Sequence, residues 1–121
     1  MVVVRLKPII WIRSSKEDLK RFPELAQRHI GFNLKAAQMG EKHPDSKSMR
    51  GFGGGSVLEV VEDYDRGTYR AVYTVRFAEA IYVLHCFQKK SRHGVATARR
   101  DINLIEQRLL RAEELHRKSV A

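Results

Sequence analysis

Three consecutive strand-like segments, at residues 56–63, 69–76 and 80–87, constrain the fold of this chain more than any other feature. They are rich in β-branched and aromatic residues, and a short turn separates each segment from the next. Short turns join antiparallel neighbours, whereas parallel neighbours need a long crossover connection. The segments therefore predict an antiparallel meander of three strands.

Alternation along the middle strand gives this meander two chemically different faces, because side chains on a strand point alternately to opposite sides. One side is wholly apolar or aromatic, and we expect it to be the core face: Tyr69, Ala71, Tyr73 and Val75. The other side is mixed: Arg70, Val72, Thr74 and Arg76. If helices cover the core face, the mixed face stays open, and alternation adds four residues of the next strand to it: Ile81, Val83, His85 and Phe87.

The sequence before the meander predicts a strand followed by a helical hairpin. Residues 9–12 are an apolar strand, and Ser14 or Ser15 can cap the helix that follows. A second helix starts near Pro23 and ends near Gln38. One apolar stripe with spacings of three and four continues through both helices: Leu19, Phe22, Ala26, Ile30, Leu34 and Ala37.

A loop and a last helix complete the predicted fold. Residues 40–55 contain Pro44 and five glycines without sustained periodicity, which predicts a long loop. Thr97 can cap a helix that runs to about Arg117 and has an inward stripe: Ile102, Ile105, Leu109 and Ala112. We therefore expect one α+β domain over residues 1–121.

Composition and charge limit the class of protein. A chain of 121 residues with a net charge of +9 suits one basic domain that attracts anions, whether RNA, DNA, a membrane surface or an acidic protein. Arg5, Lys7 and Pro8 interrupt the apolar start, which therefore lacks the core of a signal peptide. Cys86 is the only cysteine, which excludes an intramolecular disulfide. We expect a mature cytoplasmic protein with a buried free thiol.

The chain contains no familiar metal or cofactor motif. Its five histidines lack the paired spacing of metal ligands. The glycine-rich run at residues 51–55 leads into a predicted strand, not into the Lys and Ser or Thr of a Walker loop. Neither Ser56 nor Cys86 has the surroundings of an activated nucleophile. We therefore expect no metal, no small-molecule cofactor and no membrane partner.

Each of the notable basic side chains has two interpretations. No acidic residue occurs between Lys89 and Arg100, so this segment is either a solvated loop or a clamp for phosphate groups. Arg70 and Arg76 either contact nucleic acid or pair with a carboxylate of the neighbouring strand: Glu59 or Glu62. His85 is either a packed strand residue or the best acid–base candidate of the chain.

Three segments of the sequence resemble the characteristic segments of a known protein family: PIIWIRSSKEDLKRFP, KSMRGFGGGSVLEVVED and VLHCFQKKSRHGVAT. Together with the order of strand, helical hairpin, basic loop, meander and last helix, they resemble the RelE/ParE toxin superfamily, and within it the HigB-like, phage-associated branch. The resemblance covers nearly the whole chain. It implies a RelE-like domain in which the N-terminal strand and helical hairpin pack on the meander, with a C-terminal helix.

The resemblance also implies a function. It indicates the toxin of a type II toxin-antitoxin system, an endoribonuclease (mRNA interferase) that cleaves mRNA on the ribosome by metal-independent attack of a 2′-hydroxyl group. The expected partners are ribosome-bound mRNA and a cognate antitoxin, a helix-turn-helix protein. Two alternatives stay open: a non-catalytic, ParE-like inhibitor of DNA gyrase, and a phage accessory protein that binds nucleic acid.

Site residues follow from matching this sequence to the family pattern. Arg70 occupies the position of the strand arginine, and Lys89 falls near the basic position after the last strand of the meander. Residues 57–61 contain Glu59 where RelE-type nucleases have lysines. We therefore expect Glu59 or His85 to be the general base, and Arg70 and Lys89 to stabilise charge on the scissile phosphate. The other expected RNA contacts are basic: Lys47, Arg50, Arg76, Lys90, Arg92, Arg99 and Arg100.

Overall fold

The computed structural model describes residues 5–65, 67–89 and 97–120. Its elements are, in chain order, β1 (Ile9–Trp11), α1 (Ser15–Lys20), α2 (Glu24–Gln38), β2 (Ser46–Ser48), β3 (Val57–Tyr64), β4 (Gly67–Thr74), β5 (Ile81–Lys89) and α3 (Arg99–Val120). The strands form one sheet in the order β1-β5-β4-β3-β2, in which only the β1 and β5 pair is parallel. The predicted α+β class and the meander of β3, β4 and β5 are confirmed.

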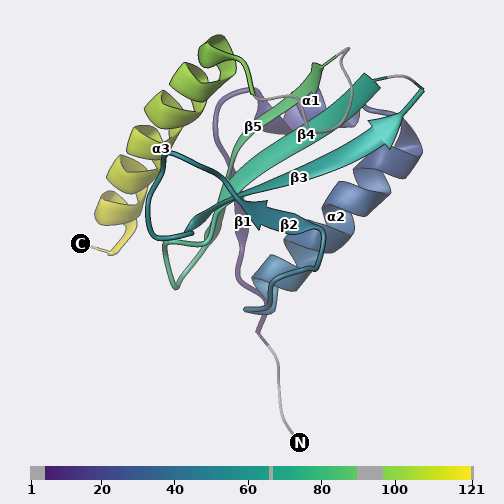
Figure 1. Cartoon of the computed structure of the whole chain (residues 1–121). Helices are drawn as coiled ribbons and strands as arrows, with labels where there is room; N and C mark the ends of the chain where they lie inside the picture. Colours follow the sequence, from purple (N-terminus) through teal and green to yellow (C-terminus); the bar gives the residue numbers. More distant parts are fainter. Residues whose placement is uncertain (1–4, 66, 90–96, 121) are drawn as a thin grey trace, which may run out of the picture.

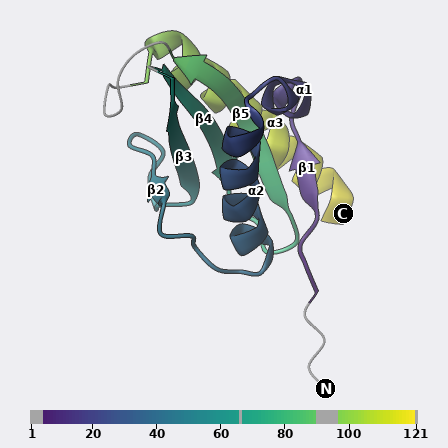
Figure 2. The ribbon, with the colours of Figure 1, turned by 90° about the vertical axis from the view of Figure 1, so that its right-hand side faces the viewer.

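Helices cover both faces of the sheet. Figure 1 shows α2 and α3 on opposite sides of it, and Figure 2 shows α2 in front of the strands with α3 behind them. The predicted stripe of the helical hairpin packs on one face, where the buried residues include Ala26, Ile30, Leu34, Ala71 and Tyr73. A second core lies under α3 and includes Val57, Val72, Leu84, Ile105 and Leu109.

The expectation of an open sheet face is therefore wrong. Val72 and Leu84 point to the α3 side, and a sheet with apolar residues on both faces needs cover on both. The inward stripe of α3 supplies that cover, with Ile105 fully buried. Although α3 is long, its many charged residues rule it out as a bilayer span, and no other helix of the described residues qualifies either.

A bulge in β5 explains which of its residues share a face with Arg70. Val72 pairs with His85, but the next residue of β4, Tyr73, pairs with Val83, so Leu84 is an extra residue in β5. Leu84 and His85 both point toward α3, while Val83 belongs to the core under α2. The prediction that Ile81 and Val83 share a face with His85 is wrong, because a bulge reverses the alternation beyond it.

The predicted long loop contains one strand that the sequence did not indicate. β2 has no apolar alternation, and buried side-chain hydrogen bonds hold its start in place. Ser46 Oγ donates to Asn33 Oδ1 of α2 at 2.7 Å and lies 2.7 Å from the hydroxyl oxygen of Tyr73 on β4. Burial raises the pKa of Tyr73, so this hydroxyl stays neutral.

Candidate functional site

The sheet register places four side chains in a row across the face that α3 covers. Lys47 of β2 pairs with Glu59 of β3, Glu59 pairs with Val72 of β4, and Val72 pairs with His85 of β5. Directly paired residues point to the same side of a sheet. Arg70, two residues before Val72, shares this face. With Arg70 counted as part of it, the row therefore holds three of the four residues that were expected to carry the chemistry: Glu59, Arg70 and His85.

Arg70 and Glu59 form the charged centre of this row. Arg70 is only 3% exposed, and its Nη1 lies 3.8 Å from Glu59 Oε2. Thr97, just before α3, links the two groups: it accepts a hydrogen bond from Arg70 Nη1 at 3.3 Å and donates one to Glu59 Oε2 at 3.2 Å. Arg70 Nε donates to Thr68 Oγ1 at 3.3 Å. Of the two sequence interpretations of Arg70, pairing with Glu59 is the one that the geometry shows.

The link through Thr97 also corrects its predicted role. The amide of Ile102 donates to the carbonyl oxygen of Ala98 at 3.0 Å, so α3 begins one residue later than a Thr97 cap would give. The hydroxyl of Thr97 satisfies the buried ion pair instead of the helix end. The start of α3 is thereby fastened to β3 and β4.

His85 lies in a second polar cluster, which belongs to α3 as much as to the sheet. Its Nε2 is 2.9 Å from Asp101 Oδ1 and its Nδ1 is 3.2 Å from Arg108 Nη1. A guanidinium only donates, so His85 Nδ1 accepts from Arg108, and the N–H group at Nε2 donates to the Asp101 carboxylate. The ring also stacks on Phe87, with centroids 4.5 Å apart.

This environment keeps the imidazole neutral. Burial lowers the pKa of His85 below its ordinary value, and the nearby Arg108 lowers it further, while Asp101 opposes both effects. A neutral histidine at neutral pH has the right charge for a general base. Both of its ring nitrogens are engaged, however, so the arrangement is that of a packed residue which positions Asp101 and Arg108.

The two predicted acid–base residues do not lie together. Val72 separates Glu59 from His85 in the row, and two strand spacings amount to about 10 Å. Glu59 is the more accessible of the two, with 18% of its side chain exposed against 8% for His85. Exposed Lys47 lies beside Glu59 on the side away from Arg70. The carboxylate of Glu59 thus lies between two cationic side chains.

A family model for Gp49-like phage-derived proteins (DUF891) matches residues 17–110. The match runs from α1 into α3 and includes every residue of the row. The chain belongs to the Gp49-like family. No curated protein matches the sequence.

The other predicted site residues of this Gp49-like protein fall into separate groups. Arg76 lies beyond the end of β4, where it pairs with Glu113 of α3 and donates to Ser56 Oγ at 3.3 Å. It is therefore distant in register from Arg70. Lys89 is half-buried at the end of β5. Three predicted RNA contacts are exposed: Arg50, Arg99 and Arg100. Two lie outside the described residues: Lys90 and Arg92.

An open groove of about 420 Å³ runs beside His85 and brings further charge into this region. It lies between α1 and the start of α3, and its lining includes Arg21, Arg100, Asp18 and Asp101. A lining with both signs of charge suits a polar ligand better than an apolar one. The groove therefore extends the row at its β5 end.

Sequence reasoning missed the two residues of α3 that hold His85. Asp101 and Arg108 are seven residues apart, with buried Ile105 between them, so all three lie on the inward stripe of the helix. The sequence did contain a signal for them: Asp101 and Arg108 are charged residues at positions of the predicted helix that would otherwise be apolar. Neither residue had a visible partner, because the helix was not expected to cover this face.

The Gp49-like chain offers no obvious place for a metal or a reactive thiol in its described part. Within residues 5–65, 67–89 and 97–120, no three His, Cys, Asp or Glu side chains converge as metal ligands would. Cys86 is buried, as predicted, and burial raises the pKa of its thiol to about 12. The thiol therefore stays protonated and unreactive at neutral pH.

Proposed function

We propose that this Gp49-like protein is the toxin of a type II toxin-antitoxin system, and that it cleaves mRNA on the ribosome in the cytoplasm without a metal ion. The RelE-like fold and the family match support the toxin role. The observation that carries the chemistry is the carboxylate of Glu59, held beside Arg70 and Lys47 on a sheet face of a protein with net charge +9. A helix-turn-helix antitoxin is the expected partner.

In the proposed reaction Glu59 takes the proton of the 2′-hydroxyl group. The 2′-oxygen then attacks the adjacent phosphorus, the bond from phosphorus to the 5′-oxygen breaks, and that oxygen takes a proton from water. Arg70 and Lys47 stabilise the charge that builds on the phosphate. His85 is a positioning residue in this scheme, because it acts through Asp101 and Arg108.

A pair of substitutions on one strand tests the assignment. Glu59→Gln should lower the rate of cleavage of ribosome-bound mRNA by about 10²-fold or more, because the general base is lost. Glu62→Gln is the matched control: Glu62 lies on β3 as well, but it contacts His29 of α2 on the opposite face. Its rate should stay near that of the wild type. Products that end in a 2′,3′-cyclic phosphate confirm the 2′-hydroxyl attack.

His85→Gln separates the two candidate bases. Assayed at a temperature where the variant is folded by circular dichroism, it should cleave within a few-fold of the wild type if Glu59 is the base. A loss of 10² or more in rate at unchanged mRNA binding would instead assign the base to the imidazole. Normal cleavage by Glu59→Gln would remove Glu59 from the mechanism.

One observation favours a toxin that binds without catalysis. The nitrogens of His85 and the guanidinium of Arg70 are engaged within the protein, and both side chains are almost fully buried. A ParE-like inhibitor of DNA gyrase needs no free acid–base group. Pulse labelling after induction distinguishes the two: incorporation of amino acids should fall first for the nuclease, and DNA synthesis first for the gyrase inhibitor.

A further inference from the structure

The outer face of α2 exposes large apolar side chains that the fold does not use. Leu25 is 59% exposed, Phe32 is 66% exposed, and Met39, directly after the helix, is 43% exposed. The outer face of a helix that packs on a sheet is normally polar, and contiguous exposed apolar surface marks sites of interaction.

These three residues form one stripe. They are seven residues apart, which brings each nearly above the previous one on a helix and gives a stripe about 21 Å long. α2 lies on the side of the sheet opposite α3, as Figure 2 shows. The stripe is therefore separate from the row of Glu59, Arg70 and His85.

Gly31 gives independent evidence for close contact on one flank of this stripe. Glycine in the middle of a helix destabilises it relative to alanine. A Cβ atom at Gly31 would meet nothing within 4 Å, so packing inside this chain does not require the glycine. Gly31 follows Arg28 by three positions and precedes Lys35 by four, so it lies on one flank of the stripe, where the absence of a side chain lets a partner backbone approach closely.

Charges along the stripe indicate the sign of the partner. Arg28 and Lys35 each follow an apolar stripe residue by three positions, so they lie on the same flank of it. Arg28 pairs with Glu24 at 2.9 Å, but both side chains are more than 60% exposed, and such a pair exchanges partners at little cost. Lys35 has no ion-pair partner among the described residues.

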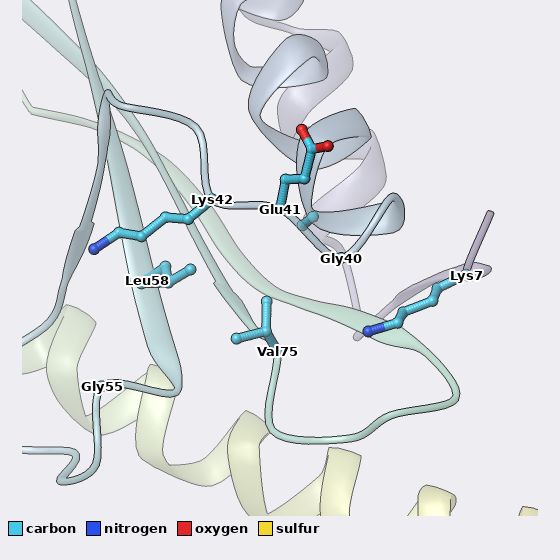
Figure 3. A pocket seen from close by; sticks show the side chains of 8 residues that line it. Lys7, Gly40, Glu41, Lys42, Gly55, Leu58 and Val75 are labelled. Atoms are coloured by element: carbon cyan, nitrogen blue, oxygen red, sulfur yellow. The ribbon is translucent and has the colours of Figure 1, made fainter. Parts of the chain in front are cut away.

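A pocket of about 260 Å³ lies near the last residue of the stripe, but on the inner side of α2, where buried Ala37 lines it together with residues of the sheet. Gly40, the residue after Met39, is part of its wall. Figure 3 shows the apolar side chains of Leu58 and Val75 in the pocket, with Lys7 extending toward Val75 and the carboxylate of Glu41 pointing away. The pocket therefore faces the sheet side of the helix and is separate from the stripe.

We propose that the outer face of α2 binds an amphipathic, acidic helix of a partner protein, with apolar side chains on Leu25, Phe32 and Met39 and carboxylates on Arg28 and Lys35. A second copy of this chain fits poorly, because its own Arg28 and Lys35 would face these same cations. The proposal goes beyond RNA cleavage and does not depend on it.

A displayed library of helical peptides tests the proposal, with leucine at heptad positions and all flanking positions randomised. Selection against the whole chain should enrich peptides with Asp and Glu on the flanks. Phe32→Ser should weaken the binding of an enriched peptide by 10-fold or more, and Gly31→Gln should weaken it by several-fold through obstruction. The matched control is Leu110→Ser on α3, where the leucine is 65% exposed and binding should be unchanged.

Circular dichroism and thermal melting confirm that each variant is folded before its affinity is compared. Enriched peptides that are neutral or basic, a failure to enrich any peptide, or binding that Phe32→Ser leaves unchanged would each overturn the proposal. Two further results would reassign the face. A dimer in sedimentation that Phe32→Ser abolishes identifies a second copy as the occupant, and a loss of RNA binding in the same variant identifies RNA.

Discussion

The two faces of the sheet differ in the kinds of side chain that they bury. The face under α2 is closed by apolar packing of Ala26, Ile30 and Leu34 against β3, β4 and β5. The face under α3 has an apolar core as well, but it also holds buried ionisable groups: Arg70, His85 and Asp101. Burial of charge is costly, so groups of this kind are expected where a protein binds or reacts. The comparison separates a face that makes the fold from one that carries the proposed chemistry.

The two helices also differ in their polar contacts. On the inner side of α2 the buried polar groups are neutral, as in the hydrogen bond of Asn33 with Ser46, whereas ionisable side chains of α3 contact the rest of the protein. One of these contacts is the hydrogen bond from Arg108 Nη1 to the carbonyl oxygen of Leu84, at 3.0 Å. Another is the contact of His116 Nε2 with Glu79, at 2.9 Å. α3 is thereby tied at its middle to β5 and near its C-terminal end to the turn that precedes β5.

The largest expected effect comes from truncating the apolar packing itself. Ile30 under α2 and Ile105 under α3 are both fully buried. Ile30→Ala should lower the free energy of unfolding by about 2–5 kcal/mol, measured by urea denaturation. If Ile105→Ala costs as much, apolar packing holds both helices equally. A cost below about 1 kcal/mol at Ile105 would show that polar contacts hold α3.

The next effect concerns buried charge. Arg70→Met removes the partner of Glu59 and two donors to threonine hydroxyls, and should lower the free energy of unfolding by about 1–3 kcal/mol. The matched control is Arg76→Met, which breaks a partly exposed pair with Glu113 and should cost less than about 1 kcal/mol. Equal costs would contradict the view that Arg70 is structurally distinct.

A smaller effect of opposite sign is expected on the outer side of α2. Gly31→Ala should raise the free energy of unfolding by up to about 1 kcal/mol, because alanine favours the helix and its Cβ meets nothing. Gly55→Ala is the contrasting substitution: Gly55 has a φ of +68°, and its Cβ would lie 3.3 Å from Ser48 Oγ, so the protein should be destabilised. Denaturation curves of the two variants decide this.

The smallest effect is a dependence on pH that arises on the α3 face. Because burial lowers the pKa of His85 in the folded protein, the unfolded chain binds a proton first as the pH falls. The contribution of His85 to stability is therefore complete above its ordinary pKa of 6.5 and is lost as the pH falls below that value. Wild type and His85→Gln should differ less in stability at pH 5.5 than at pH 7.5. An unchanged difference would contradict the burial effect.

The spacing of apolar residues predicted much of the fold, because most helices and strands keep the helical or the strand periodicity over their whole length. The stripe that contains Ile30 and Leu34 gave α1 and α2, and strict alternation gave both faces of β4. β2 could not be predicted in this way, because its place depends on hydrogen bonds of Ser46 to residues distant in sequence. The sequence shows which residues are polar, but not which distant partner satisfies them.

The candidate site could be predicted only where its partners are neighbouring strands. The pair of Arg70 and Glu59 followed from the meander as one of two interpretations. The contacts of His85 with Asp101 and Arg108 did not, because they require α3 to lie on a face that was expected to be open. Residue types were therefore visible in the sequence, while the docking of the last helix decided which of them meet.

The extra residue at Leu84 makes one position of β5 unusually tolerant of deletion. Without it the strand would alternate without interruption, Val83 would still pair with Tyr73 and face α2, and His85 would still pair with Val72 and face Asp101 and Arg108. A gene that loses the three nucleotides of this codon would keep every charged side chain in place and lose only one buried leucine from the core under α3. Removal of a residue from a regular part of the strand would instead turn every side chain on one side of the gap to the opposite face, and is expected to be far more damaging.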